Sequence, residues 1–376
     1  MQRIDHALIS PSLGSQRTLS SFHFGSPDAG LKVYLQASLH AEELPGMLVA
    51  HHLRSLLEGA ENAGLLRGEV VLVPMANPIG LAQRINHKPT GRFELDSAEN
   101  FNRNYPNLAQ AVLSGLAARL RQDPDHNLTV VRSAIANYLR NWQPLSELQS
   151  LRKTLLQLSH DADVFIDLHC DCEAVMHFYC EESCWPQLEP LAYFMQSEAI
   201  LLARNSGGAP IDECLSGVWW QLAEALQAAG HSFPMPQGCC STTIELRGEA
   251  DVSHAYARQD AQALFSYLQW IGLVHCDHAP PPPAPRCQPT PLAGSQTLRA
   301  PRPGVVVFAV APGSALRSGD LVAEIINPLN AESCPVRAEV DGVLYARIRD
   351  RYVSAGCELG KIAGAHAFRV GQLLGD

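Results

Sequence analysis

The sequence has no uninterrupted run of about 18 apolar residues, the length that a membrane-spanning helix needs. Residues 1–25 also lack a basic start followed by an apolar stretch, so we expect no secretory signal. Positive charge is scarce, because 28 Lys and Arg stand against 38 Asp and Glu, giving a formal net charge of −10. Nucleic acids and anionic membranes require a basic face. We therefore expect neither as a partner, and we expect a cytoplasmic protein.

Paired CxxC motifs are absent as well, although the chain has 11 Cys. An odd number at irregular spacing indicates neither a zinc knuckle nor a disulfide framework, so we expect reduced thiols in the core. Hydrophobic residues make up 46% and charged residues 18%, a balance typical of globular proteins. A length of 376 residues suits about two domains.

Short strand-like runs alternate with helical patterns through the first part of the chain. This alternation predicts an α/β domain over residues 1–277, with a mixed, mostly parallel sheet flanked by helices. Apolar residues at helical spacing predict a helix through residues 44–57. The expected strands are residues 31–37, 69–75, 163–168 and 242–246.

A proline-rich segment, residues 278–294, divides the chain. Proline fixes φ and lacks the amide donor, so this segment is expected to be a stiff linker. Residues 295–376 follow as short strands broken by Gly-containing turns, which predicts a small all-β module. Two stretches, SGDLVAEI from Ser318 and AGCELGKI from Ala355, each pair a Gly turn with a strand.

Two histidines and a glutamate are candidate metal ligands. His40 and Glu43 form a His-x-x-Glu motif where one predicted strand ends, and His169 follows another predicted strand. Both strands should end at the same edge of the sheet, which is where chemistry gathers in such folds. Two histidines and a carboxylate form a catalytic zinc site with an open fourth position. The alternatives are a solvated His40 and a core histidine at position 169.

Glu245 lies inside the apolar run TTIELRG. A carboxylate in such a strand is costly unless it meets a cation, a metal or water in a cleft. Glu245 is therefore a candidate general base, and the alternatives are a salt bridge with Arg247 or a side chain that faces solvent. Asn102 and Arg103, with Arg92 and Arg84 upstream, could hold a carboxylate and a developing oxyanion. Alternatively, these four are polar loop residues.

Taken in order, these residues resemble the zinc carboxypeptidase superfamily, and specifically its succinylglutamate desuccinylase/aspartoacylase branch. The pattern is His-x-x-Glu at 40–43, Asn-Pro at 77–78, Asn-Arg at 102–103, and then His169 and Glu245, each on a strand. The similarity spans roughly residues 30–265. The family often has Asp-Leu-Asn-Arg where this chain has Asn100-Phe101-Asn102-Arg103. The terminal module is similar to lipoyl/biotinyl-like sandwich domains, but its hairpin tip at residues 338–343 has no carrier lysine.

The resemblance implies one Zn²⁺ per chain on His40, Glu43 and His169, with Glu245 as general base. It implies that Asn102 and Arg103 bind a substrate carboxylate, and that Arg92, or Arg84 as second choice, polarises the scissile carbonyl. The expected activity is hydrolysis of a small N-acyl amino acid or related carboxylate-bearing amide. A metallocarboxypeptidase acting on short peptides and a non-catalytic metal- or ligand-binding protein are the alternatives. The module is expected to be a wall or lid of the site, or the contact of a homo-oligomer.

Overall fold

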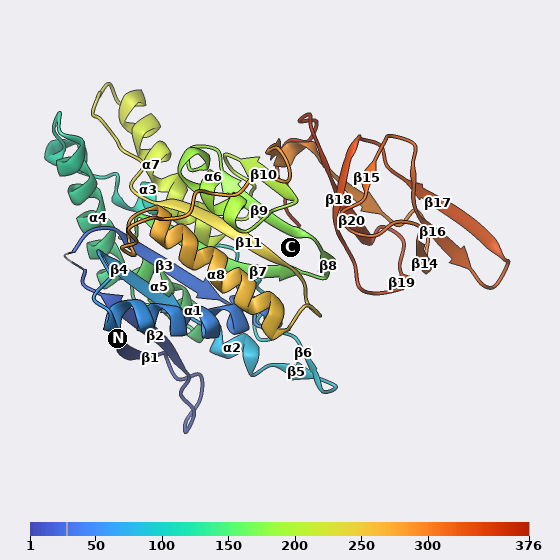
Figure 1. The fold of residues 1–376 in the computed structure, drawn as a ribbon, viewed down its shortest axis with the longest axis horizontal. Coiled ribbons are helices and arrows are strands. Elements are labelled where there is room, and N and C mark those ends of the chain that lie inside the picture. The colour runs from blue at the N-terminus through green and yellow to red at the C-terminus, as the bar shows by residue number, and fades with distance from the viewer. Residues whose placement is uncertain (28, 376) are drawn as a thin grey trace.

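The computed structural model describes residues 1–27 and 29–375 and contains a nine-stranded sheet at its centre. The strand order is β1-β2-β4-β3-β7-β11-β9-β10-β12 (Figure 1). The strands are β1 (Gln2–Ala7), β2 (Thr18–Gly25), β3 (Lys32–Ala37), β4 (Glu69–Val73), β7 (Val164–Asp171), β9 (Met176–Glu181), β10 (Ala199–Ala203), β11 (Cys240–Gly248) and β12 (Thr290–Pro291).

The central sheet is mixed and mostly parallel, as predicted. Strands β4, β3, β7 and β11 run parallel to one another, and β9, β10 and β12 form a second parallel set. The two sets meet at the antiparallel pair of β11 and β9, while β1 and β2 add an antiparallel edge. The centre of the sheet is therefore β7 and β11, which are buried on both faces.

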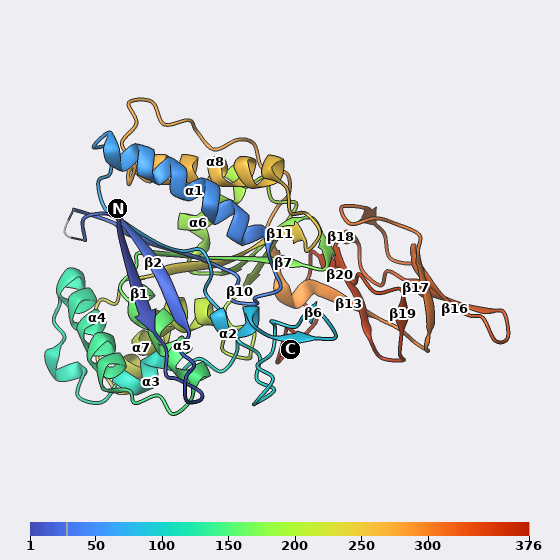
Figure 2. The same cartoon turned by 90° about the horizontal axis from the view of Figure 1, so that it is seen from below.

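Helices cover both faces of the sheet, and each face has its own hydrophobic core (Figure 2). One face packs against α1 (Pro45–Asn62), α6 (Trp185–Phe194) and α8 (His254–Trp270). The other packs against α3 (Leu108–Val112), α4 (Pro124–Asn141), α5 (Glu147–Ser159) and α7 (Ile211–Ala228). Shorter elements are α2 (Pro78–Leu81), η1 (Ala117–Arg119) and the hairpin of β5 (Arg84–Ile85) and β6 (Lys88–Pro89). Among the described residues, no helix is long and apolar enough to cross a membrane.

The C-terminal part is all β, as predicted, and has a separate core. Its strands form two antiparallel sheets, with the order β13-β20-β18-β15 in one and β17-β16-β14-β19 in the other. The body strand β8 (Glu173–Ala174) also pairs with β18, which ties the module to the body (Figure 1). The elements are η2 (Leu292–Gly294), β13 (Ser295–Arg299), β14 (Gly304–Phe308), β15 (Ala315–Leu316), β16 (Leu321–Asn327), β17 (Glu332–Arg337), β18 (Gly342–Arg347), β19 (Tyr352–Val353) and β20 (Glu358–Gly364).

The Gly turns of the module precede strands as the sequence predicts. Gly319 precedes β16 and Gly356 precedes β20, both with positive φ, a conformation that glycine adopts at no steric cost. The predicted strand at residues 163–168 ends too early. The strand β7 continues through His169 to Asp171, because Glu245 of β11 pairs with His169 and Gly248 pairs with Asp171. His169 thus lies within the strand rather than beyond its end.

Candidate metal centre

The loop between β3 and α1 presents His40 and Glu43 to one point. The backbone turns at Ser38, whose φ is 58°, and the Ser38 hydroxyl donates to the Glu43 carbonyl oxygen over 3.0 Å. The amide of Glu43 donates to the carbonyl oxygen of His40, also over 3.0 Å. This tight turn brings two side chains three residues apart to the same side. Both are buried, with 3% of His40 and 4% of Glu43 exposed.

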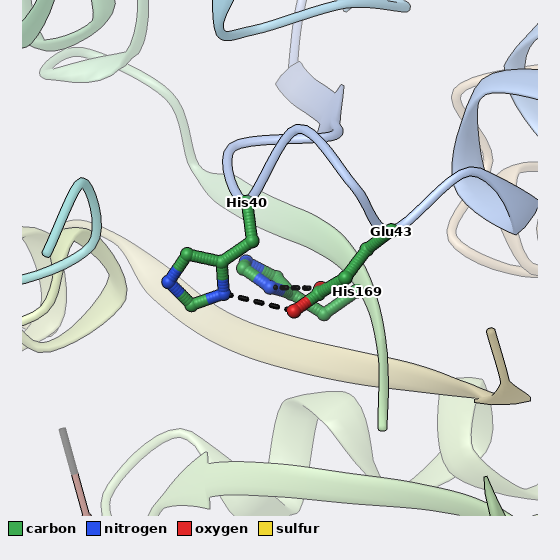
Figure 3. Close-up of side chains that lie close together, drawn as sticks. All are labelled: His40, Glu43 and His169. Carbon is green, nitrogen blue, oxygen red and sulfur yellow. Dashed lines mark hydrogen bonds and ion pairs between the residues drawn. The ribbon is translucent and has the colours of Figure 1, made fainter. Parts of the chain in front are cut away.

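His169 reaches the same point from β7 (Figure 3). The Glu43 carboxylate lies between the two imidazoles, with Oε1 2.9 Å from Nδ1 of His40 and Oε2 2.8 Å from Nδ1 of His169. One ligand atom from each of the three residues lies within 4.8 Å of the others. Two imidazole nitrogens and a carboxylate oxygen are ligands that zinc accepts. The donor set therefore fits the metal that the resemblance implies.

The outer nitrogen of each imidazole lies close to a side-chain oxygen, and such neighbours orient metal-binding histidines. Asn100 Oδ1 lies 2.8 Å from His40 Nε2, and Asp167 Oδ2 lies 3.0 Å from His169 Nε2. Asn100 stands where the family often has Asp. Its amide oxygen accepts from His40 as a carboxylate would, but without a negative charge.

Burial and charge act differently on the two histidines. Burial, together with the positive charge of Arg92, lowers the pKa of His40 to about 4. Burial also acts to lower the pKa of His169, but Asp167 and Glu43 outweigh it and hold that pKa well above its usual range. The pKa of Glu43 is well below its usual range, because both histidines outweigh the effect of burial. The surroundings thus favour the charged forms of Glu43 and His169 and the neutral form of His40.

Glu245 faces the same site from β11, directly across from His169 in the strand pairing. Its Oε2 is buried and has no hydrogen-bond partner among the described residues. Burial and the charge of Glu43 raise the pKa of Glu245 to about 8. The predicted alternative, a salt bridge with Arg247, does not form. A positive φ of 65° and a shift in the strand register turn Arg247 away to pair with Asp260.

The two candidate polarising arginines are in different places. Arg92 lies at the metal centre, with Nη1 3.3 Å from both Glu43 Oε1 and His40 Nδ1. Arg84 belongs to the exposed β5–β6 hairpin and does not line the cavity beside the metal centre. The geometry thus favours Arg92.

Asn102 and Arg103 are buried in the wall of the cavity. Asn102 Oδ1 accepts from the first amide of α7, Ile211 N, at 3.0 Å, so this side chain helps to begin the helix. Arg103 Nη1 donates to the carbonyl oxygen of Asn102 over 2.8 Å. Arg103 Nη2 donates to the carbonyl oxygen of Gly375 over 2.5 Å. A segment near the end of the chain therefore occupies the neighbourhood of this arginine.

The metal centre opens into a cavity of about 560 Å³ whose walls come from both parts of the chain. The body contributes the groups described above, and the module contributes Lys361. Lys361 Nζ lies 3.1 Å from Asp171 Oδ2, at the end of β7. Leu374 and Gly375 also line the cavity, and the Leu373 amide donates to the Ser206 carbonyl oxygen over 2.7 Å.

The carboxylates of Glu181, Asp212 and Glu213 also line the cavity, and the sequence did not single them out. Asp212 and Glu213 occupy the first turn of α7. Acidic residues are common there because they interact favourably with the helix dipole. Their position in the sequence therefore carries no signal that they face a cavity.

The fold and the buried His-Glu-His cluster define an α/β protein with a candidate catalytic metal site at the edge of a mixed sheet. Residues 29–131 match the succinylglutamate desuccinylase/aspartoacylase catalytic domain, a range that contains His40, Glu43 and Arg103. The resemblance to this family predicted from the sequence is thus confirmed.

Solved structures resemble nearly the whole chain. A family protein from Shewanella amazonensis is 26% identical, with a TM-score of 0.83, and the match covers 96% of this chain and 98% of that one. A family protein from Shewanella frigidimarina is 24% identical, with a TM-score of 0.85 and coverages of 96% and 97%. The ectoine utilization protein EutE (DoeB) from Ruegeria pomeroyi shares the fold, with a TM-score of 0.66 at 13% identity over 96% and 93%. No curated protein matches the chain.

Proposed function

We propose that the protein is a zinc-dependent amidohydrolase that removes the acyl group from a small N-acyl amino acid. The observation that carries this proposal is the convergence of His40, Glu43 and His169 beside Glu245, a carboxylate with a raised pKa and a buried oxygen without a partner. The family match supports the reaction class. One zinc ion bound by the two histidines and Glu43 would supply a Lewis acid at the scissile carbonyl.

The residues around the metal centre each have a chemical task in this reaction. Glu245 takes the proton from the attacking water and later passes it to the leaving amine, the work of a general base and acid. Its pKa of about 8 keeps the proton affinity close to neutral pH. The guanidinium of Arg92 stabilises the oxyanion that develops on the carbonyl. Asn100 and Asp167 hold the two imidazoles in orientation.

Arg103 is proposed to hold the substrate carboxylate, because a guanidinium offers two parallel donors to such a group. In the structure, one of its nitrogens donates to the main-chain oxygen of Gly375. A substrate carboxylate would take the place of this main-chain oxygen. The segment 372–375 must then shift when substrate binds.

This same segment supports a second candidate, a metallocarboxypeptidase that cleaves short peptides. Leu373 and Gly375 bind the cavity wall through main-chain groups, as a peptide substrate would. Both candidates use the same residues for the reaction. Only the choice of substrate separates them.

The test pairs metal analysis of the purified protein with hydrolysis assays on N-acetyl, N-formyl and N-succinyl amino acids and on dipeptides. We expect one zinc per chain and release of free amino acid from the N-acyl compounds. Faster cleavage of dipeptides would favour the carboxypeptidase. A zinc-loaded protein that hydrolyses none of these amides would overturn both candidates and leave a metal- or ligand-binding protein.

A further inference from the structure

The cavity extends along the sheet away from the metal centre. On β11, the side chains of Glu245, Thr243 and Ser241 all line it. A strand advances about 3.3 Å per residue, so alternate residues stand about 7 Å apart on one face. Thr243 is therefore about 7 Å from the position of Glu245, and Ser241 is about twice as far. The helix α7 packs against β11 along this stretch.

Asp212 is fixed over this far part of the cavity by two hydrogen bonds. Its Oδ2 accepts from Thr243 Oγ1 at 2.9 Å, and its main-chain oxygen accepts from Ser241 Oγ at 2.7 Å. Asp212 is 9% exposed, and its Oδ1 has no hydrogen-bond partner among the described residues. A buried carboxylate oxygen left without a partner is costly unless a ligand compensates.

Glu181 and Glu213 line the cavity together with Asp212. Their close hydrogen-bond donors are neutral: Ser183 Oγ at 2.8 Å for Glu181, and the Ser206 amide at 2.7 Å for Glu213. In the part of the chain that the structure describes, no Lys, Arg or His nitrogen comes within 4.0 Å of these three carboxylates. Burial raises the pKa of Asp212, and burial and Asp212 raise that of Glu213 to about 7, as expected for acids without a close cation.

Two cations of the cavity are committed elsewhere. Lys361 lies against Asp171 and Glu358, at 3.1 and 3.5 Å. Arg92 lies against Glu43 at the metal centre. Arg103 acts on Glu213, but only from beyond ion-pair distance. At this end of the cavity, the described residues therefore offer Asp212 and Glu213 no Lys, Arg or His nitrogen within ion-pair distance.

We propose that the acidic end, formed by Asp212 and Glu213, binds a cationic side chain of the substrate. This inference rests on the proposed function and narrows it to N-acyl amino acids, or peptides, that carry a lysine- or arginine-like group. The length of a lysine side chain fits the spacing of residues along β11. A lysine ammonium reaches about 6 Å from its Cα, given bond lengths of about 1.5 Å. That reach matches the spacing of about 7 Å between Glu245 and Thr243 along β11.

The test compares two substrates that differ only by the charged amine: Nα-acetyl-L-lysine and Nα-acetyl-L-norleucine. For the wild-type enzyme, we expect kcat/KM to be at least about 30-fold higher for the lysine compound, since an unpaired buried charge discriminates strongly. Asp212→Asn and Glu213→Gln, made singly and together, should reduce this ratio about tenfold or more. Glu224→Gln is the matched control on the exposed face of α7, and it should leave the ratio unchanged.

Binding gives a readout that does not depend on turnover. Calorimetry on the Glu245→Gln variant should show free L-lysine binding more tightly than L-norleucine, and Asp212→Asn in that background should remove the difference. Hydrolysis of both substrates at equal kcat/KM would contradict the proposal that the acidic end binds a cationic side chain. The proposed function would still hold. Hydrolysis of neither, with selective lysine binding, would support the acidic end and overturn the proposed function.

Discussion

The cavity contains two groups of carboxylates, which differ in whether the protein supplies a cation to pair with them. Near the metal centre, Glu43 has His40 and His169, and Asp171 has Lys361. These partners outweigh burial and lower the pKa of both acids. Along β11 and α7, the reverse holds: burial raises the pKa of Glu245, Asp212 and Glu213.

The carboxylates of the first group are paired with a cation of the protein. Those of the second group are not, and a substrate or a proton can pair with them. A paired acid holds its neighbours in place, as Glu43 does for the two imidazoles. An unpaired acid can take a proton from water, as proposed for Glu245, or a cation from the substrate, as proposed for Asp212. Each variant below changes one of these acids or the cation paired with it, so each tests one part of the comparison.

The largest effect is expected from His169→Ala, which removes one partner of Glu43. Two local ligands cannot close a metal site alone, so the variant should lose stoichiometric metal and, with it, activity. Metal content of the dialysed protein measures this directly. His177→Ala is a control, since His177 is also a buried strand histidine and pairs with Glu245 in register. A fully metallated His169→Ala protein would contradict the assignment.

Glu245→Gln comes next, because it removes an unpaired acid and leaves the paired ones intact. We expect zinc to stay bound while kcat falls by roughly 10²–10⁴, the usual contribution of a general base. Metal analysis and steady-state kinetics on the same preparation separate the two quantities. Activity close to that of the wild type would remove Glu245 from its proposed role.

These two variants concern residues that the sequence could identify. His40, His169 and Glu245 each stand on or just after an apolar strand, and parallel strands deliver their side chains to one sheet edge. The same logic predicted the mixed sheet and the separate β module. Resemblance added the order of the motifs. The positions of the strands depend on short-range sequence patterns, so they could be predicted from the sequence.

The rest depended on contacts between distant segments. Nothing near Asn100 in the sequence indicates that its amide oxygen meets His40, because 60 residues separate them. Lys361 meets Asp171 across 190 residues. Asp212 and Glu213 have the position of ordinary first-turn acids, and only the packing of α7 on β11 turns them toward a cavity. The pairing of β18 with β8 likewise requires the module to be docked.

A third variant, Lys361→Met, would convert Asp171 from a paired into an unpaired acid. Loss of one partner from a partly buried ion pair should lower the free energy of unfolding at pH 7 by roughly 1–3 kcal/mol. We expect kcat to change less than tenfold, because Lys361 belongs to neither the metal centre nor the general base. Urea unfolding and kinetics test the two statements. Lys361→Arg keeps the charge and should recover most of the lost stability.

The smallest effect concerns pH and the unpaired Glu213, whose pKa of about 7 lies above its ordinary value of 4.5. The folded state then holds a proton that the unfolded state releases, so wild-type stability should decline as pH rises from about 5 to 7. A glutamine at position 213 does not titrate. The free energy of unfolding of Glu213→Gln should therefore decline by about 1–2 kcal/mol less than that of the wild type. Urea unfolding at pH 5 and pH 8 measures the difference. Glu224→Gln, on the exposed face of the same helix, should follow the wild type. If Glu213→Gln also does so, Glu213 is satisfied in the folded protein and belongs with the paired acids.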